Sequence, residues 1–242
     1  MRRIAFFVEG ATEVIFIEKL IEEIAGKNNV TIERGYVRGG KTIPKQITVI
    51  NAQNVSSECY YYVLILNCQG DHQVVQRIAE EHRNFSNAGY EKIIGLRDVR
   101  PVFQNFEIPR LEADFKKRFN LSPISIEIIL SIMEIESLFL GEATHFEKVD
   151  PLITVDAIKS KLGFDPISDD MELRAKPAED LAGCYAIAGK TYTKYLAQDT
   201  INALDFYLIY LEHPKKFQSL SRLVFHIDSF LSPPELPERQ CA

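Results

Sequence analysis

The sequence lacks the marks of a membrane protein and of a disulfide-stabilised secreted protein. Nothing at its N-terminus has the length of a signal-peptide apolar region. Its longest apolar stretch, residues 124–140, is interrupted by three glutamates and is a poor candidate to span a bilayer. The four cysteines are scattered and form no C-x-x-C pair: Cys59, Cys68, Cys184 and Cys241. We therefore expect a cytoplasmic protein with reduced thiols and no membrane segment.

Several kinds of chemistry also lack a sequence signal. The five histidines show no spacing typical of zinc ligands, there is no P-loop, and no Ser-His-Asp arrangement can be argued. The formal net charge of -6 argues against a surface that coats nucleic acid by charge alone. A local basic groove or a bound metal ion would still allow the protein to bind phosphate.

What the chain does contain is enough apolar sequence for a substantial core. It has 242 residues, of which 46% are hydrophobic, and it shows no internal repeat or low-complexity tract. This length suits one large domain, or a main domain with a smaller appendage. We therefore expect a globular protein.

Short apolar runs alternate with helical patterns in the first part of the chain. Helical spacing is seen from Thr12, a plausible N-cap, to Gly26, from Val74 onward, and over residues 112–119. The predicted strands are residues 4–8, 30–37, 60–66, 92–96 and 124–133, with a flexible basic loop at residues 39–45. This order predicts an α/β fold: a Rossmann-like, mostly parallel sheet with helices on both faces.

From about residue 150 the pattern becomes helical. Thr154 can cap a short helix that ends at Gly163, and Pro177 fits the first turn of another helix. Further helices are predicted over residues 200–212 and 217–231, before a tail that we expect to fray. We predict an α/β domain at residues 1–149 and a helical C-terminal subdomain at residues 150–242, packed on the sheet or beside its active edge.

Carboxylates recur where the predicted strands end. Glu9 closes the first strand, Glu13 lies in the first turn of the following helix, and Asp98 follows a later strand. Glu134 and Glu136 come at the end of the fifth apolar run. Because the carboxyl ends of parallel strands meet at one edge, these acids should converge there. Oxygen ligands of this kind suit Mg²⁺, or Mn²⁺ in its place.

Some of these acids also have an ordinary structural explanation, whereas Glu9, which ends an apolar strand just before Gly10, gains nothing from packing. The helix dipole favours Glu13 in a first turn, and Asp98 could form a turn or an ion pair with Arg97 or Arg100. If residues 134–136 were helical, Glu134 and Glu136 would point about 200° apart and could not share an ion. Asn67 and Asp71 lie in a polar turn and are minor candidates.

The acidic segments resemble those of the TOPRIM fold, and more closely its OLD-like nuclease branch. The matching segments are Val8-Glu9-Gly10-Ala11-Thr12-Glu13, Leu96-Arg97-Asp98-Val99-Arg100, and residues 133–140 with Glu134 and Glu136. The resemblance covers roughly residues 1–145. It extends to small TOPRIM-like proteins encoded beside ATPases in prokaryotic defence loci. It implies a Rossmann-like sheet, Mg²⁺ dependence, cleavage or nicking of DNA or RNA phosphodiesters, and an ATPase partner.

One position departs from the family pattern. Where the second motif normally reads Asp-x-Asp, this chain has Asp98-Val99-Arg100. An arginine cannot ligate a cation, so a further acid would have to come from Glu134, Glu136 or Asp71. Arg100 could instead hold a phosphate by a bidentate contact. The sequence thus also allows a catalytically silent module that binds an ATPase or nucleic acid without cleaving it.

Basic residues could complete the site. Lys194 belongs to a cluster of cations and aromatics with Lys190, Tyr192 and Tyr195. A lysine beside the metal would stabilise the charge that develops on a cleaved phosphodiester, a role that Lys194 or Lys176 could serve. The prediction is a nuclease with catalytic Glu9, Asp98 and Lys194 and phosphate-binding Arg100 and Lys176. A small-molecule phosphotransfer enzyme on the same sheet and a homo-oligomeric state both remain open.

Overall fold

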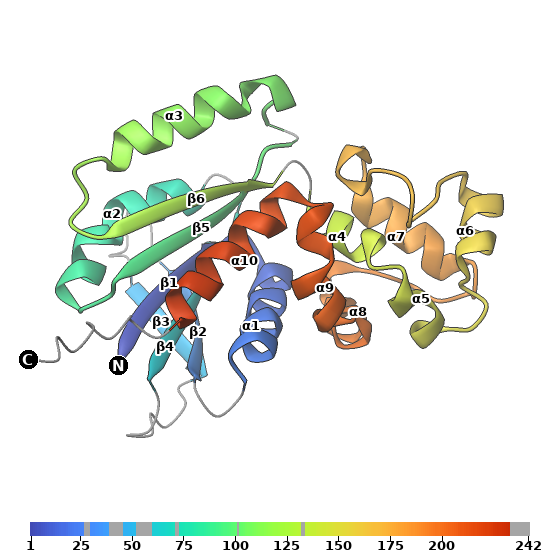
Figure 1. Cartoon of the computed structure of the whole chain (residues 1–242), viewed down its shortest axis with the longest axis horizontal. Helices are drawn as coiled ribbons and strands as arrows, with labels where there is room; N and C mark the ends of the chain where they lie inside the picture. Colours follow the sequence, from blue (N-terminus) through green and yellow to red (C-terminus); the bar gives the residue numbers. More distant parts are fainter. Residues whose placement is uncertain are drawn as a thin grey trace, which may run out of the picture.

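A computed structural model describes residues 1–26, 30–38, 46–51, 60–70, 73–100, 102–131 and 134–232. A sheet with helices against it forms one part of the molecule, and a group of short helices forms a lobe beside it (Figure 1). The predicted α/β fold with a helical C-terminal region is therefore confirmed.

The sheet has six strands in the order β3-β2-β4-β1-β5-β6. Only β3 runs antiparallel to its neighbour; the other pairings are parallel. The strands are β1 (Arg2–Val8), β2 (Val30–Arg38), β3 (Gln46–Asn51), β4 (Tyr61–Asn67), β5 (Lys92–Asp98) and β6 (Ser125–Ser131). The sheet is thus mostly parallel, as the alternation of strands and helices predicts.

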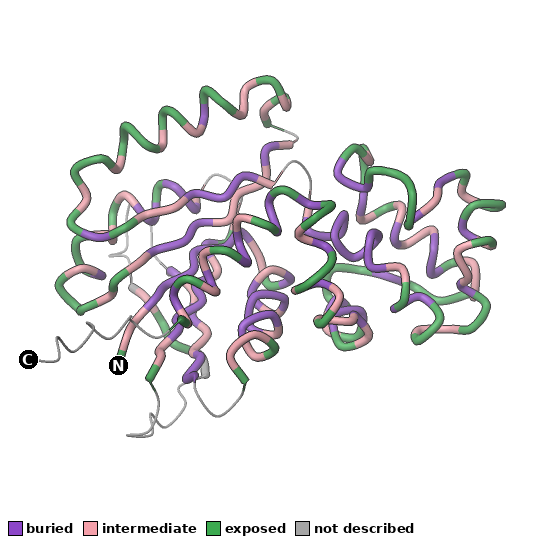
Figure 2. Tube along the Cα trace, in the orientation of Figure 1, coloured by how far each residue is buried: buried purple, intermediate pink, exposed green. Residues whose placement is uncertain are grey.

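Helices cover both faces of this sheet. On one face lie α1 (Ala11–Ala25) and α10 (Gln218–Leu231), and on the other lie α2 (Gln73–Asn87) and α3 (Ile108–Phe119). Alternate residues of β1 accordingly enter two separate cores, Phe6 with α1 and Phe7 with α2. The central strands are buried along most of their length (Figure 2). This two-sided burial explains why their sequences are continuously apolar.

The lobe consists of short helices whose ends follow local sequence signals. They are α4 (Glu136–Gly141), α5 (Thr144–Val149), α6 (Val155–Leu162), α7 (Pro177–Ala186), α8 (Ala197–Ala203) and α9 (Phe206–Leu211). The Thr154 hydroxyl accepts a hydrogen bond from the Ala157 amide at 3.1 Å, and Gly163 ends α6 with a φ of 75°. Both ends of α6 are therefore as predicted.

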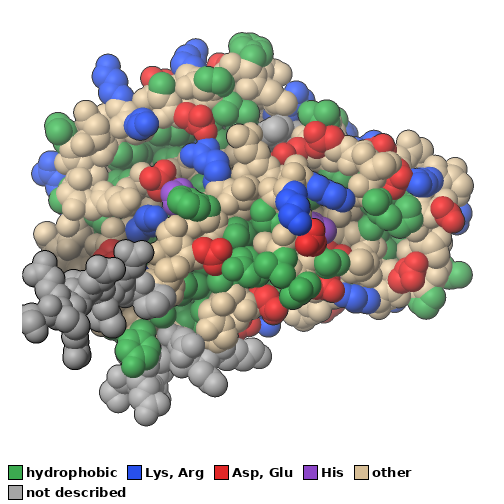
Figure 3. Space-filling view, viewed as in Figure 1, with side chains coloured by type: hydrophobic (Ala, Val, Ile, Leu, Met, Phe, Trp, Pro, Cys, Tyr) green, Lys and Arg blue, Asp and Glu red, His purple; other side chains and the backbone are tan. Residues whose placement is uncertain are grey.

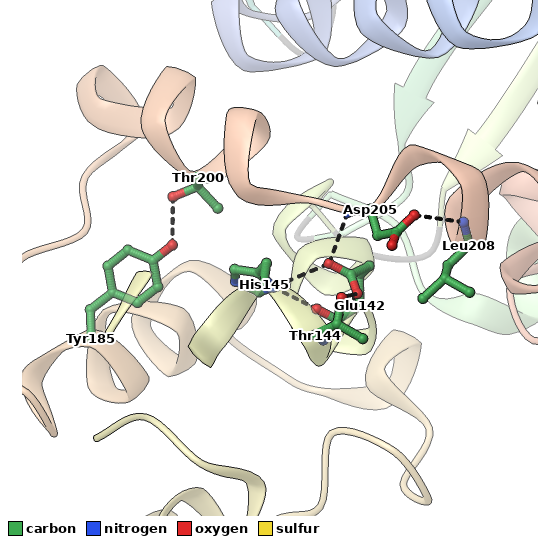
Figure 4. Close-up of polar contacts among 7 residues, drawn as sticks. All are labelled: Glu142, Thr144, His145, Tyr185, Thr200, Asp205 and Leu208. Atoms are coloured by element: carbon green, nitrogen blue, oxygen red, sulfur yellow. Dashed lines mark hydrogen bonds and ion pairs between the residues drawn. The ribbon is translucent and has the colours of Figure 1, made fainter. Parts of the chain in front are cut away.

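A buried polar cluster ties parts of the lobe together (Figure 4). The Glu142 carboxylate accepts hydrogen bonds from the backbone amides of Thr144 at 3.0 Å and Asp205 at 3.2 Å. His145 is fully buried, and its Nδ1 lies against the carbonyl oxygen of Glu142. Since a carbonyl can only accept, Nδ1 carries the proton of a neutral ring. The turn between α4 and α5 is thereby fastened to the start of α9.

The last helix returns from the lobe to the sheet. Arg2 donates to the carbonyl oxygen of Phe230 at 2.6 Å, and the Tyr61 hydroxyl donates to that of Leu231 at 2.6 Å. Residues 150–232 therefore lie both in the lobe and against the sheet. The proposed boundary between residues 149 and 150 stays a prediction.

The structure differs from the sequence-based expectations at a few places. Strand β3 was not expected, the predicted 200–212 helix is two helices, and Gly10 rather than Thr12 is the N-cap of α1. The two helices separate because the Asp205 side chain caps the second, accepting from the Leu208 amide at 3.2 Å. The predicted loop at 39–45 and the tail after Ser232 lie outside the described residues. Among the described helices, none is long and apolar enough to cross a membrane.

Candidate functional site

Three of the predicted acids line one small cavity at the carboxyl edge of the sheet. Glu9, Glu13 and Asp98 face a volume of about 30 Å³, which suffices for an ion or one or two water molecules. The other lining residues are mostly apolar and come from the sheet, α1, the start of α4 and α10: Phe16, Leu96, Ile129, Ser131, Ile135, Leu138, Ser219, Leu220 and Leu223. The carboxylates are thus set against a largely apolar wall.

The cavity lies where the chain connections diverge. Strands β1 and β5 are neighbours in the sheet, but β1 leads into α1 on one face and β5 leads toward α3 on the other. This divergence leaves a crevice beyond the strand ends, which is where open α/β sheets bind their ligands. Glu9 follows β1 and Asp98 ends β5, so the two acids flank that crevice.

Glu9 is held by two backbone amides, one at the end of β5 and one in the turn after β4. Its Oε1 accepts a hydrogen bond from the Asp98 amide at 2.9 Å, and its carbonyl oxygen accepts one from the Gly70 amide at 3.0 Å. The residue is only 8% exposed. Burying a carboxylate costs free energy unless it is hydrogen-bonded, and the Asp98 amide lowers that cost for Glu9.

Glu13 combines a helix-capping role with a place in the cavity. It occupies the first turn of α1, and a Cβ on Gly10 would lie 3.0 Å from its Oε2. Burial raises the pKa of Glu13, as does the nearby Glu136, while hydrogen bonds with the backbone of Glu13 itself and of Gly10 work in the opposite direction. Glycine at position 10 therefore lets the carboxylate fold back over the turn.

Asp98 is buried close to three other acidic side chains. Its pKa is raised well above the usual range, first by burial and then by the charges of Glu9, Glu13 and Glu134. Within the described part of the chain it forms no ion pair, because the Arg97 guanidinium lies over Phe103 and Arg100 Nε donates to Asn105. The ion-pair explanation for Asp98 is therefore not supported.

The third acidic motif, with Glu134 and Glu136, lies where the chain passes from β6 into the lobe. Glu136 is the first residue of α4, and Glu134 lies in the connection between β6 and α4. The Tyr192 hydroxyl donates to Glu136 Oε1 at 2.8 Å, whereas Glu136 Oε2 is buried with no hydrogen-bond partner. Burial raises the pKa of Glu136. An unsatisfied buried carboxylate oxygen is costly and points to a missing ligand.

Lys194 brings a positive charge to this group of acids. Its Nζ lies 2.9 Å from Glu134 Oε1, in a pair that is partly open to solvent. Desolvation works against its charge, but Glu136, Glu134 and Glu13 outweigh it and raise the pKa of Lys194. The structure thus gathers all five predicted acids and Lys194 into one electrostatic network, which we call the acidic network.

The predicted phosphate-binding residues line a neighbouring groove. Arg100, Gln104 and Glu134 face Lys176 across a volume of about 390 Å³, together with Ala175, Ala178 and Glu179 of the start of α7. Lys176 pairs with Glu179 at 2.8 Å. Arg100 and Lys176 therefore lie next to the acidic network through Glu134, and because Glu134 and Glu179 also line this groove we call it the mixed-charge groove.

The two minor candidates, Asn67 and Asp71, are not seen to take part in the acidic network among the described residues. Asn67 Oδ1 accepts from the Gln69 amide at 2.8 Å, which makes it a turn residue, and Asp71 lies outside the described residues. Sequence reasoning missed the hydrogen bond from Tyr192 and the contribution of α10 to the cavity wall. No spacing signal joins these positions to the acids, because both come from distant parts of the chain.

The acidic network has the donor chemistry that Mg²⁺ prefers. Carboxylate oxygens are hard ligands, and the partnerless Oε2 of Glu136 is the kind of atom that a cation would satisfy. Across the described ranges, no three His, Cys, Asp or Glu side chains already stand as a finished metal site. The acidic network therefore offers the oxygen ligands that Mg²⁺ prefers, but its carboxylates would have to change rotamer to bind one ion together.

Comparisons with known proteins give little further guidance. No family model and no curated protein matches the chain. Among solved structures, a hypothetical protein from Pyrococcus horikoshii OT3 aligns with 96% of this chain and 100% of its own, at 14% identity and a TM-score of 0.43. A similarity of that strength supports no conclusion about function.

Proposed function

We propose that the protein is a Mg²⁺-dependent TOPRIM-like nuclease that cleaves or nicks DNA or RNA phosphodiesters. The observation that supports this proposal most is the acidic network, in which Glu9, Glu13, Asp98, Glu134 and Glu136 converge with Lys194 beyond the ends of parallel strands. Mutual repulsion and burial make this arrangement unfavourable for the empty protein. Such a cost is typical of a site that binds a cation or carries out chemistry.

In this proposal the acids would bind the metal ion and the basic residues would bind the phosphate. Glu9, Glu13, Asp98 and Glu136 would hold the ion, which supplies charge stabilisation at phosphorus and an activated water when bound. The Asp98 carboxyl holds a proton more readily than an ordinary aspartate and would release it when a cation arrives. Lys194 Nζ would stabilise charge on the phosphate oxygens. Leu220 and Leu223 of α10 exclude water from one side of the cavity.

The surface charge is consistent with local rather than general recognition of phosphate. On the face shown in Figure 3, acidic and basic side chains are interspersed. Arg100 and Lys176 of the mixed-charge groove would therefore contact phosphates next to the scissile bond. The resemblance to small TOPRIM-like proteins extends the proposal to a cytoplasmic role in anti-phage defence with an ATPase partner.

Cleavage assays test this proposal directly. Purified protein is incubated with supercoiled plasmid and with RNA, with Mg²⁺, with Mn²⁺ and with EDTA, in the presence and absence of an ATPase partner. We expect nicked or linear products that require the metal and that disappear in an Asp98→Asn variant. Intact substrates under every condition would overturn the proposal.

A second function is favoured by one specific residue. Arg100 stands where the family pattern has an acid, which supports a silent module that binds an ATPase or nucleic acid without cleaving it. Phage-challenge assays separate the two functions, since a silent module would still protect cells with Glu9→Ala and Asp98→Ala substitutions. Loss of protection in both variants, with normal protein levels, would favour the nuclease.

A further inference from the structure

The segment that leads into the 3-10 turn η3 (Lys194–Leu196) meets the third acidic motif at two points. The Tyr192 hydroxyl donates to Glu136 Oε1 at 2.8 Å, and Lys194 Nζ donates to Glu134 Oε1 at 2.9 Å. Thr193, which lies between them, is extended, with a φ of -143° and a ψ of 157°. On an extended backbone residues two apart share a side, so one short segment of the lobe can hold both glutamates.

The two carboxylate oxygens of Glu136 have different surroundings. The residue is 0% exposed, and its Oε1 accepts from Tyr192. Its Oε2 is buried and has no hydrogen-bond partner among the residues that the structure describes. The charge of Glu136 acts on Glu13 and on Lys194, so this carboxylate lies close to other members of the acidic network. A cation bound at Oε2 would supply the missing partner.

Tyr192 is itself held by the packing of the lobe. It is only 5% exposed, and its ring lies edge-on to that of Tyr185, with the centroids 5.8 Å apart and the planes at 80°. The hydroxyl of Tyr185 is hydrogen-bonded to Thr200 Oγ1 of α8, with the two oxygens 2.8 Å apart (Figure 4). The Tyr192 hydroxyl therefore reaches Glu136 from a ring that other side chains keep in place.

We propose that Tyr192 is a positioning residue for the metal ligand Glu136: its hydroxyl occupies Oε1, so that Oε2 is the oxygen left to bind the cation. This inference rests on the proposed nuclease function and adds to it a residue outside the three acidic motifs. Hydrogen-bond partners of metal-ligating side chains orient those ligands, and their loss typically lowers metal affinity by about 10- to 100-fold. A bond that served the fold alone would contribute to stability without changing metal affinity.

Metal binding is measured without nucleic acid and without cleavage. Mn²⁺ is titrated into the wild-type protein and into Tyr192→Phe, and the electron paramagnetic resonance signal of free Mn²⁺ gives the bound fraction. The substitution removes the hydroxyl and keeps the ring that packs on Tyr185. We expect the dissociation constant for Mn²⁺ to rise about 10-fold or more in the variant.

Tyr185→Phe is the matched control. It also removes a buried tyrosine hydroxyl, but one that bonds to Thr200 and not to an acid of the network. This variant should bind Mn²⁺ as the wild type does. Thermal midpoints in EDTA verify that both variants are folded before their metal affinities are compared.

A double-mutant cycle tests whether Tyr192 acts through Glu136. In a Glu136→Gln background the oxygen that Tyr192 positions is already lost. Tyr192→Phe should then change the Mn²⁺ dissociation constant by less than about twofold, because two residues that act as one unit are not additive. The same loss in both backgrounds would show that Tyr192 does not work through Glu136 and would overturn the inference.

The inference and the nuclease proposal can fail separately. Unchanged Mn²⁺ affinity in Tyr192→Phe, or an equal loss in Tyr185→Phe, would overturn the inference and leave the nuclease proposal standing. Weakened binding in Tyr192→Phe alone, with no cleavage of any nucleic acid by the wild type, would uphold the inference and overturn the nuclease proposal. A wild-type protein that binds no Mn²⁺ would overturn both.

Discussion

The backbone amide of Asp98 donates a hydrogen bond to the carboxylate of Glu9, with Asp98 N and Glu9 Oε1 2.9 Å apart. This bond joins the first and second acidic motifs through the end of β5. It sets the direction of the Glu9 side chain by a backbone contact that does not depend on the charge of Glu9. An amide in place of the carboxylate can therefore keep the geometry while losing the negative charge.

Replacement of Glu9 by glutamine should separate structure from activity. In Glu9→Gln the amide oxygen can still accept from the Asp98 amide, so we expect the thermal midpoint to change little. Metal-dependent cleavage should fall by about 100-fold or more, because a neutral amide is a much weaker ligand for Mg²⁺. Plasmid-nicking rates at several Mg²⁺ concentrations, with differential scanning calorimetry of the same samples, measure both effects.

Glu23→Gln is the matched control for this substitution. Glu23 lies on the exposed side of the same helix, α1, and its change alters net charge by the same amount. It should leave cleavage unchanged. A Glu9→Gln variant as active as the control would show that Glu9 has no part in the reaction.

Lys194 should matter for catalysis far more than its sequence neighbour Lys190. Lys194→Met removes the cation that acts on the carboxylates of the acidic network, so we expect single-turnover cleavage to fall about 100-fold. Lys190→Met removes a lysine from the same segment that pairs with Asp150 at 3.6 Å. Single-turnover rates at saturating Mg²⁺ compare the two, and similar rates would contradict the role of Lys194.

The buried ring of His145 should make the fold sensitive to acid. Burial, the largest effect, lowers the pKa of His145, so the folded protein keeps the ring neutral while the unfolded chain takes up a proton below its ordinary pKa of about 6.5. The free energy of unfolding should therefore fall as the pH drops through about 6.5. The slope for one proton is at most about 1.4 kcal/mol per pH unit.

Urea unfolding at several pH values between about 5.5 and 7.5 measures this slope. A His145→Gln variant should lose the part of this pH dependence that comes from His145. It should keep the part that comes from His213, because burial lowers the pKa of that ring as well. Equal slopes in wild type and variant would show that His145 is not the group responsible.

An ion pair joins two helices beside β6, which is one of the two edge strands of the described sheet. Arg222 of α10 contacts Glu112 of α3, and these helices lie on either side of β6 (Figure 1). Within the described residues β6 pairs only with β5, so its other edge needs protection against pairing with a second chain. A double Arg222→Ala, Glu112→Ala variant should lose less than about 1 kcal/mol of stability but associate more readily.

Sedimentation velocity over a range of concentrations checks this expectation. The control removes another exposed pair, Lys215 and Glu212, in the connection between α9 and α10. That variant should sediment as wild type. Association of both variants to the same extent would rule out a specific effect at the β6 edge.

The strand ends and their acids could be predicted because both follow from local rules. A short apolar run closed by an acid and Gly10 predicts the end of β1, and parallel strands end at one edge. That reasoning brought Glu9 and Asp98 together correctly. The end of the fifth strand is less well predicted, because the apolar run at residues 124–133 continues past Ser131, where β6 ends.

The rest of the site depends on packing between distant segments. Tyr192 bonds to Glu136 across 56 positions in the sequence, and Leu220 reaches the cavity from α10. Neither contact leaves a spacing pattern in the sequence. The cap of α1 was misplaced for a different reason: Thr12 is a common cap residue, but it lies inside the helix and Gly10 occupies the capping position.

The return of α10 to the sheet bears on when the site can form during synthesis. This helix supplies Ser219, Leu220 and Leu223 to the wall of the acidic cavity. Its own C-terminal end is fastened to Arg2 and Tyr61, which precede their partners by 228 and 170 positions in the sequence. We therefore expect a nascent chain to carry all its acidic motifs without an enclosed cavity. Only when residues 218–231 have left the ribosome can the cavity close.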